Sequence, residues 1–188
     1  QALQLCPDLL IVKPRMDAYK AVSQEIHGIF RDYTDLIEPL SLDEAYLDVS
    51  ACSHFAGSAT RIADAIRRRV ARELRITVSA GVAPNKFLAK IASDWQKPNG
   101  LFVITPAQVD EFVLALPVAE LHGVGKVTGQ RLGGMGIQTC AQLREWSKPA
   151  LAREFGSFGE RLWSLARGID ERAVQVNSRR QSVSVEHT

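Results

Sequence analysis

Two adjacent carboxylates, Asp43 and Glu44, stand between two runs whose apolar residues alternate as they do in β-strands. An unpaired carboxylate buried inside a sheet costs at least several kcal/mol, so this pair belongs at an edge or on a metal ion. A tight junction between the two strands would hold both side chains at a rigid sheet edge. Carboxylates placed in this way are the ligands that Mg²⁺ takes together with phosphate oxygens. Taken alone, the same pair is also typical of a solvated turn.

Three lysines follow downstream, and a strand at residues 76–82 returns them toward the same sheet. Lys86 and Lys90 are four residues apart and share one face of a helix, which is ordinarily a solvated face. Lys97 differs because Pro98 and Gly100 restrict the turn around it. A fixed ammonium group suits the charge of a nucleotide triphosphate, so Lys97 is the candidate for binding one.

A third candidate is the sequence Leu121-His122-Gly123-Val124-Gly125-Lys126, which lies between two short helical segments. Two glycines around one aliphatic residue are the pattern of a helix–hairpin–helix. Glycine tolerates positive φ and lets backbone amides approach a phosphate, which the N-terminus of the next helix also attracts. Such a loop would bind the DNA backbone at any sequence. Its alternative is a tight helical turn without a ligand.

The elements that must position these groups alternate between strands and helices up to about residue 105. Asp17 is the expected N-cap of the first long helix, and Ser58 begins the next one. The expected strands are residues 9–12, the two runs around the carboxylates, 76–82 and 101–104; the expected helices are residues 17–33, 58–74 and 83–94. This order predicts an α+β layer of ferredoxin-like type, with its helices on one face of the sheet.

From residue 105 onward the strand pattern disappears. The expected helices are residues 106–116, 118–121, 126–135, 139–146, 149–155 and 159–167. Because glycine or proline separates these short segments, we predict a second, all-helical domain with its boundary near residue 105. Residues 170–180 are polar and basic, as in a linker.

Charge and composition narrow the class of protein. Residues 1–50 carry four Lys or Arg against nine Asp or Glu, whereas the remaining residues carry nineteen against twelve. An acidic segment followed by a basic body fits a metal site beside a surface that binds a polyanion. Three cysteines without CxxC spacing indicate neither a zinc site nor a disulfide framework, and they suit a reducing cytoplasm. No apolar run approaches the length that a membrane span requires.

Both ends of the sequence have the character of interior segments. Residue 1 is Gln rather than Met and opens a helix-like pattern, while residues 182–188 alternate like the first half of a strand. We therefore expect the chain to be a fragment of a longer protein.

Residues 37–49, residues 79–100 and the hairpin at Gly123 and Gly125 resemble, in this order, two palm motifs and the thumb hairpin of Y-family, lesion-bypass DNA polymerases. The similarity runs over essentially the whole chain. It implies translesion DNA synthesis in a bacterial cytoplasm, with primer-template DNA and a deoxynucleoside triphosphate (dNTP) as partners. A sliding clamp would be bound through parts outside the chain.

The resemblance also implies roles for single residues. Asp43 would bridge two catalytic Mg²⁺ ions, and Glu44 would bind the ion that activates the primer 3′-hydroxyl. Lys97 would contact the incoming triphosphate, and Ser41 would lie near the primer terminus. The expected contacts to DNA are completed by the backbone of Gly123, Val124 and Gly125 and by the side chain of Lys126.

By the same resemblance the chain is an incomplete palm followed by a whole thumb. The family's third metal-binding aspartate and its aromatic steric gate would precede residue 1, so we expect the 188-residue polypeptide alone to be inactive or nearly so. The expected domains are residues 1–14 from the fingers, 15–105 from the palm without its first strand, 106–172 from the thumb, and 173–188 from the linker and the start of the little finger.

Two other functions remain open from the residues alone. A nucleotidyl cyclase also places acidic metal ligands on a ferredoxin-like palm, but it has no need of a phosphate-binding hairpin. A DNA-binding module that has lost catalysis would keep the hairpin, although it would have no use for Asp43, Glu44 and Lys97.

Overall fold

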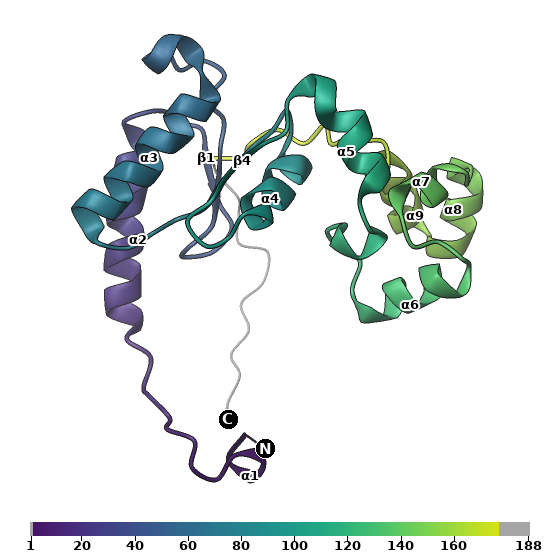
Figure 1. Ribbon diagram of the computed structural model, residues 1–188, viewed down its shortest axis with the longest axis horizontal. Helices are drawn as coiled ribbons and strands as arrows, with labels where there is room; N and C mark the ends of the chain where they lie inside the picture. Colours follow the sequence, from purple (N-terminus) through teal and green to yellow (C-terminus); the bar gives the residue numbers. More distant parts are fainter. Residues whose placement is uncertain (1, 177–188) are drawn as a thin grey trace.

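The computed structural model describes residues 2–176 and has two halves, one with all of its strands and one that is entirely helical (Figure 1). Strands and helices alternate as far as β4, and only helices and turns follow. The predicted α+β class, with an all-helical second part, is therefore confirmed. Within residues 2–176, no helix is long and apolar enough to cross a membrane.

The two strands around the carboxylates form an antiparallel hairpin, as predicted. β1 (Ile37–Pro39) pairs with β2 (Ala45–Leu47), and Glu38 lies opposite Tyr46. Residues 40–44 close the hairpin, which is held at its base by a 2.9 Å hydrogen bond from the Leu40 N–H to the Glu44 carbonyl. The carboxylates thus belong to a tight connection that fixes their backbone.

A second pair of strands is parallel and is joined by a helix. β3 (Ala80–Val82) pairs with β4 (Leu101–Val103), and α4 (Lys86–Trp95) makes the crossover between them. The N-cap of α4 is Asn85, whose side chain accepts a hydrogen bond from the Leu88 N–H at 3.0 Å. The helix therefore begins three residues later than the expected residue 83.

The two strand pairs are separate in the part of the chain that the structure describes, because no backbone ladder joins them. α4 nevertheless packs directly on β3: a Cβ on Gly81 would lie only 2.2 Å from the Ala89 carbonyl oxygen. The expected single sheet is thus divided into two strand pairs. α4 contacts β3 by close packing rather than by strand pairing.

Two long helices complete the first half. α2 (Met16–Arg31) packs on α3 (Ala59–Leu74), and α3 packs on β3. Their small apolar core consists of Ile29, Ile62, Ile66 and Val70. Ser58 caps α3 as predicted, but Asp17 does not cap α2. It lies in the first turn, where a carboxylate interacts favourably with the helix dipole.

The first residues of the chain lie away from this core. The predicted strand at residues 9–12 is wrong, since the segment has no regular structure and Leu10 is 84% exposed. A strand requires a neighbouring strand to satisfy its backbone, and within residues 2–176 this segment has none. α1 (Ala2–Leu5) precedes it as a single exposed turn. A further short turn, η1 (His54–Gly57), leads into α3.

The second half consists of short helices, as predicted. They are η2 (Pro106–Gln108), α5 (Val109–Ala115), η3 (Val118–Glu120), α6 (Lys126–Gly134), α7 (Cys140–Arg144), α8 (Lys148–Phe155) and α9 (Ser157–Leu165). Side-chain oxygens of Thr139 and Ser147 cap α7 and α8. Each cap marks where a new helix begins, only a few residues after the preceding helix ends. The short connections keep the half compact.

One apolar core extends across the predicted boundary at residue 105. Phe87, Leu88 and Ile91 of α4 belong to the same buried cluster as the leucines of the helical half. Figure 1 shows α4 between the strands and the helices of the second half. α4 is therefore shared by both halves, and it is the natural element to transmit position from one to the other.

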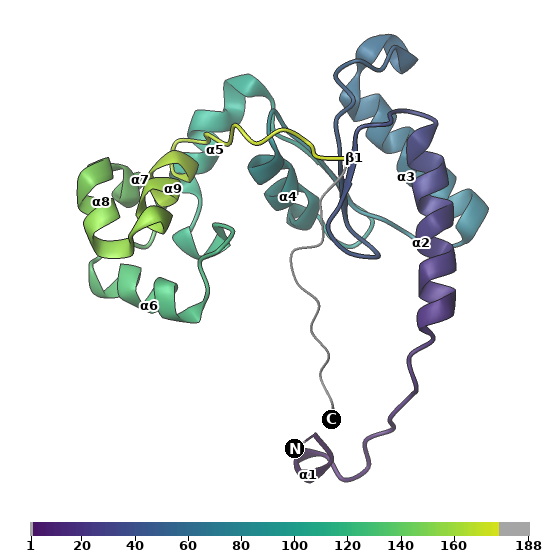
Figure 2. The ribbon, with the colours of Figure 1, turned by 180° about the vertical axis from the view of Figure 1, so that it is seen from behind.

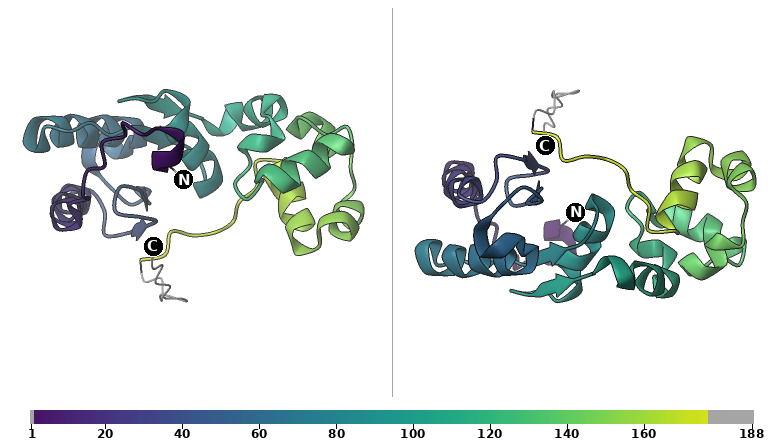
Figure 3. Two further views of the ribbon diagram at one scale, coloured as in Figure 1. Left: turned by 90° about the horizontal axis from the view of Figure 1, so that it is seen from below. Right: turned by 90° about the horizontal axis from the view of Figure 1, so that it is seen from above.

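After α9 the chain returns to the first half. Residues 168–176, here called the strap, contain no helix or strand and run from α9 past α4 to β1 (Figures 1 and 2). The views from below and above show that the strap bridges the two halves (Figure 3). The predicted start of a little finger falls on residues 177–188, which lie outside the described part of the chain.

Candidate active site

Ser41 organises the loop that carries the two carboxylates. Its hydroxyl donates to Asp43 Oδ1 at 2.5 Å and accepts from the backbone N–H of Glu44 at 3.1 Å and of Asp43 at 3.3 Å. One short side chain thereby orients the Asp43 carboxylate and closes the turn. The expectation that Ser41 lies near a primer terminus stays a prediction, but its structural role is an addition that the sequence did not reveal.

The second carboxylate is held from the neighbouring helix. Lys90 of α4 donates to Glu44 Oε1 at 2.6 Å, and one turn earlier Lys86 donates to Glu38 Oε2 at 2.5 Å. Lys86 is only 8% exposed, so the expectation of a solvated lysine face is wrong for this residue. The prediction that Lys86 and Lys90 share one face of a helix is confirmed. Nothing in the sequence indicated that Glu38 and Glu44 would be their partners.

The chemistry of the hairpin fits part of a magnesium site. Asp43 is exposed and Glu44 is partly exposed, and adjacent carboxylate oxygens on a fixed turn are the donors that Mg²⁺ prefers. Among residues 2–176 there is no group of three His, Cys, Asp or Glu side chains that could hold a metal ion. Asp43 and Glu44 would therefore be two ligands of a site that needs further oxygens from elsewhere.

Lys97 lies in a fixed turn, as predicted, but its partner is local. Its ammonium group lies 2.5 Å from Asp94 Oδ1, and both side chains are about half exposed. Arg67 of α3 stabilises the turn by donating to the Asn99 carbonyl and, at 3.0 Å, to Asn99 Oδ1. Arg67 was missed because nothing in its helical spacing distinguishes it from the other arginines of α3.

The two glycines of the helical hairpin have different reasons to be glycine. Gly123 has a φ of 96°, and a Cβ there would lie 2.8 Å from the Phe158 ring. Gly125 has a φ of −83°, and no atom lies within 4 Å of the position of a Cβ. The positive-φ explanation is therefore correct for Gly123 and wrong for Gly125. At Gly125 the open space favours close approach by something outside the protein.

The amides around Gly125 have the chemistry that would suit an anion. Gly125 is the N-cap of α6 and offers no side chain to the first turn, which begins at the exposed Lys126. Free N–H groups, the positive end of the helix dipole and an ammonium group thus coincide. The Val124 N–H instead donates to the Leu121 carbonyl at 2.9 Å, so its predicted contact with a phosphate would compete with an internal bond.

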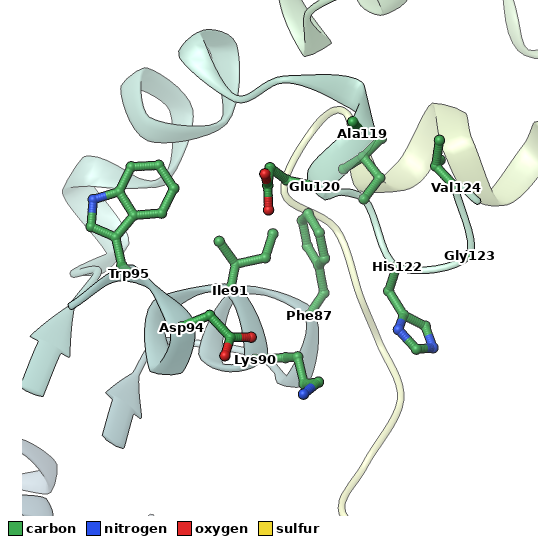
Figure 4. A pocket seen from close by; sticks show the side chains of 11 residues that line it. Phe87, Lys90, Ile91, Asp94, Trp95, Ala119, Glu120, His122, Gly123 and Val124 are labelled. Atoms are coloured by element: carbon green, nitrogen blue, oxygen red, sulfur yellow. The ribbon is translucent and has the colours of Figure 1, made fainter. Parts of the chain in front are cut away.

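A cavity of about 500 Å³ lies between α4 and the loop of the helical hairpin at residues 121–124. Side chains of α4 line one side, and the loop around His122 and Gly123 lines the other (Figure 4). Lys90, the partner of Glu44, is among the lining residues. Lys90 therefore connects the carboxylate hairpin to a cavity that lies between the two halves of the chain.

Similarity to known proteins assigns the chain to a family. The impB/mucB/samB family matches residues 1–94, and the thumb domain of DNA polymerase-iota matches residues 119–170. The chain is 79% identical to proteins named DNA polymerase IV from Ectopseudomonas mendocina (strain ymp) and from Pseudomonas aeruginosa (strain UCBPP-PA14). Each match covers all of this chain but only 53% and 54% of the relative, so the chain spans about half their length.

Solved structures agree with the sequence matches. A Y-family DNA polymerase chimera, Dbh-Dpo4(243-245)-Dbh, superimposes with a TM-score of 0.85 and 36% identity over 95% of this chain and 52% of that one. DinB from Sulfolobus solfataricus gives 0.82 and 35% over 93% and 52%. The resemblance noted in the sequence is confirmed over both halves, and the chain belongs to the Y family of DNA polymerases.

Proposed function

We propose that the protein performs template-directed DNA synthesis past lesions, by transferring a nucleotide to a primer 3′-hydroxyl. The observation that supports this most directly is the hairpin of Asp43 and Glu44, held by Ser41 and by Lys90, which also lines the cavity beside the helical hairpin loop. This hairpin is part of a sequence that is 79% identical to a protein named DNA polymerase IV. One relative's structure is an insertion ternary complex of Dbh DNA polymerase, which agrees with primer-template DNA and a dNTP as ligands here.

Each residue has a defined task in this proposal. Asp43 and Glu44 would hold Mg²⁺, which when bound offsets negative charge and makes a hydroxyl more acidic. Ser41 keeps the Asp43 carboxylate in one orientation, which limits the reorganisation needed for metal binding. Lys97, released from Asp94, would neutralise the triphosphate. We assign residues 15–105 to the palm and 106–172 to the thumb.

The helical half would grip the DNA backbone. The amides at Gly123, Val124 and Gly125 and the ammonium group of Lys126 would contact phosphates rather than base edges, so binding would not depend on sequence. We further propose two Mg²⁺ ions in the working enzyme, a sliding clamp bound by other parts of the protein, and activity in the bacterial cytoplasm.

The competing function is a DNA-binding module without catalysis. The substitution Asp43→Ala separates the two, because a polymerase would lose Mg²⁺-dependent dNTP binding while a simple DNA-binding module would be unaffected. Asp110→Asn is the matched control, since it also removes one negative charge but lies 74% exposed in the helical half. Equal dNTP binding by the Asp43 variant and the control would contradict the polymerase assignment.

Primer extension tests the same proposal at the level of the reaction. Because only two carboxylates of the expected three are present, the 188-residue polypeptide should extend a primer hardly at all. The whole protein should extend it, and Asp43→Ala in that protein should abolish extension. Extension by the polypeptide at the rate of the whole protein would show that the metal site has been assigned incorrectly.

A further inference from the structure

Lys86 is a charged residue that is only 8% exposed. Removing an ammonium group from water costs several kcal/mol unless strong partners compensate. Such a residue is retained only where its partners have a use for the charge. Its position in the first turn of α4, the helix shared by both halves, makes those partners informative.

The partners of Lys86 come from three separate segments. The ammonium group donates to Glu38 Oε2 of β1 at 2.5 Å and to the Ala173 carbonyl of the strap at 3.2 Å. It also lies 5.2 Å from the centre of the Tyr46 ring of β2. Since Glu38 and Tyr46 are opposite each other in the ladder, Lys86 holds both strands of the carboxylate hairpin at once.

The strap is attached to the same region at further points. The Asn85 side chain donates to the Gly168 carbonyl at 2.7 Å, and Asp170 Oδ2 accepts from the Phe87 N–H at 3.0 Å. Near the other end, the Gln175 N–H donates to Glu38 Oε2 at 2.8 Å. Although it lacks regular structure, the strap is therefore fixed along its length to the start of α4 and to β1.

Charge at these contacts favours the attached state. Burial raises the pKa of Glu38, but the hydrogen bonds from Lys86 and from the Gln175 N–H outweigh it and hold that pKa below its usual value. Asp170 is 5% exposed and forms two hydrogen bonds of 2.7 Å with the Arg172 guanidinium. Both carboxylates are thus ionised and paired near neutral pH, as attachment by charged hydrogen bonds requires.

The hairpin is held by apolar packing of Leu47 of β2 on the core of α2 and α3 and by polar contacts from α4. No backbone ladder joins β1 and β2 to β3 and β4 in the described part of the chain. The ion pairs from α4 that reach the hairpin are Lys86 with Glu38 and Lys90 with Glu44. Lys86 and Lys90 together thus tie the hairpin of Asp43 and Glu44 to α4, and Lys86 in addition holds the strap.

We propose that Lys86 is a positioning residue that couples the strap to the hairpin of Asp43 and Glu44. Displacing the strap loosens the hairpin, and loosening the hairpin releases the strap. The segment that leaves the helical half thereby sets the position of the metal-binding carboxylates. The consequence for metal binding rests on the proposed function, whereas the coupling itself does not.

Amide hydrogen exchange on the 188-residue chain tests the coupling. Glu38→Gln and Asp170→Ala should each speed exchange in the hairpin at residues 40–47 by about tenfold, because each removes charged hydrogen bonds without touching Asp43 or Glu44. Exchange at the fully buried Leu143 and Leu162 should stay unchanged. Asp170→Asn, which keeps an oxygen for the Phe87 N–H, should restore most of the protection.

Two controls separate coupling from a general loss of stability. Lys148→Met breaks the exposed pair between Lys148 and Glu160 in the helical half and should leave the hairpin unchanged. Lys86→Met should affect the hairpin and the strap together. Equal acceleration at Leu143, Leu162 and the hairpin, or an unaffected hairpin in Asp170→Ala, would overturn the proposal.

Mn²⁺ titration adds the readout for positioning. Asp170→Ala should weaken Mn²⁺ binding about threefold to tenfold, although residue 170 is not a ligand. Faster hairpin exchange with unchanged Mn²⁺ affinity would show that Lys86 does not position the carboxylates. Because the 188-residue chain carries only part of the expected metal site, the titration is made on the whole protein. Absence of Mn²⁺ binding there before any substitution would contradict the proposed function, and the exchange data would still decide the coupling.

Discussion

The two halves of the molecule are held together by different forces. In the helical half, Leu132, Leu143, Leu151 and Leu162 are completely buried in one cluster. In the strand-containing half, the core of α2 and α3 is small, and the carboxylate hairpin is tied to α4 by two Lys–Glu pairs. Burial of apolar area stabilises without direction, whereas a charged hydrogen bond fixes a particular atom in place.

This difference matches the tasks proposed for the halves. A surface that grips DNA backbone at any sequence needs a stable platform, and a closed leucine core provides one. Carboxylates that hold a metal need to be placed within a fraction of an ångström, and directional bonds from α4 achieve that. Because α4 belongs to the core of the helical half, the helix that positions the carboxylate hairpin is itself held by this stable core.

The largest effect should come from the core of the helical half. Leu162→Ala removes a side chain with no exposed surface and should lower the free energy of unfolding by about 2–5 kcal/mol. Leu114→Ala, where the residue is 36% exposed on α5, should cost less than about 1 kcal/mol. Urea unfolding followed by fluorescence of Trp146 and Trp163 measures both. Equal losses would mean that the leucine cluster does not carry the stability of this half.

The helical half was the easier part to predict from the sequence. Its boundaries follow from local chemistry: Thr139 and Ser147 cap helices, and proline or glycine separates them. The strand at residues 9–12 failed because a strand depends on a distant neighbour that local chemistry does not show. Secondary structure decided by contacts within four residues is readable, and structure decided by long-range pairing is not.

Alkaline pH should weaken the helical half through Cys140. Burial raises the pKa of this thiol to about 11, from an ordinary value of 9.0. The folded state therefore keeps the proton more tightly, so its stabilising contribution is complete below pH 9 and is lost as pH rises toward 11. The loss amounts to about 2–3 kcal/mol when complete.

Cys140→Ala is the control for this pH dependence, because the variant has no thiol to ionise. Under reducing conditions, urea unfolding at pH 8 and pH 10.5 should show a steeper decline for the unsubstituted chain than for the variant. Parallel declines would show that other groups cause the loss. Cys6, which is exposed, should react with a thiol reagent without unfolding.

A pair of glycine substitutions tests how stability and DNA binding divide within the helical hairpin. Gly123→Ala forces an L-residue to a φ of 96° beside Phe158 and should cost about 1–3 kcal/mol of stability. Gly125→Ala meets open space at a φ of −83° and should cost less than about 0.5 kcal/mol. If a phosphate approaches there, it should nevertheless weaken DNA binding about tenfold.

Thermal unfolding and DNA titration by fluorescence anisotropy measure the two effects separately. If Gly125→Ala lowered the free energy of unfolding as much as it lowered the free energy of DNA binding, the evidence that a phosphate approaches Gly125 closely would be removed. The sequence pattern predicted both glycines but gave them one explanation. The distinction needs the backbone angle and the neighbours of each residue, since Phe158 lies more than thirty residues away in the chain.

The candidate site was predictable to the extent that its groups are adjacent in sequence. Asp43 and Glu44, or Gly123 to Lys126, are visible as short motifs. Lys90, which holds Glu44, is 46 positions away from it, and the pair of Glu38 and Lys86 is separated by 48 positions, so these contacts exist only in the folded chain. A buried lysine is also contrary to the usual preference of the residue, so composition alone predicts the opposite.

The smallest effect concerns a single exposed charge on the stable half. If Lys126 contacts a phosphate at the start of α6, Lys126→Ala should lower the slope of log affinity against log salt by about one unit. Lys148→Ala removes another exposed lysine, which is already paired with Glu160, so its slope should not change. Titrations on two unrelated duplex sequences should give the same result, because the contact is to backbone. A Lys126 effect confined to one duplex would mean that the helical half reads bases, and the division between a sequence-blind platform and a precise catalytic half would then be wrong.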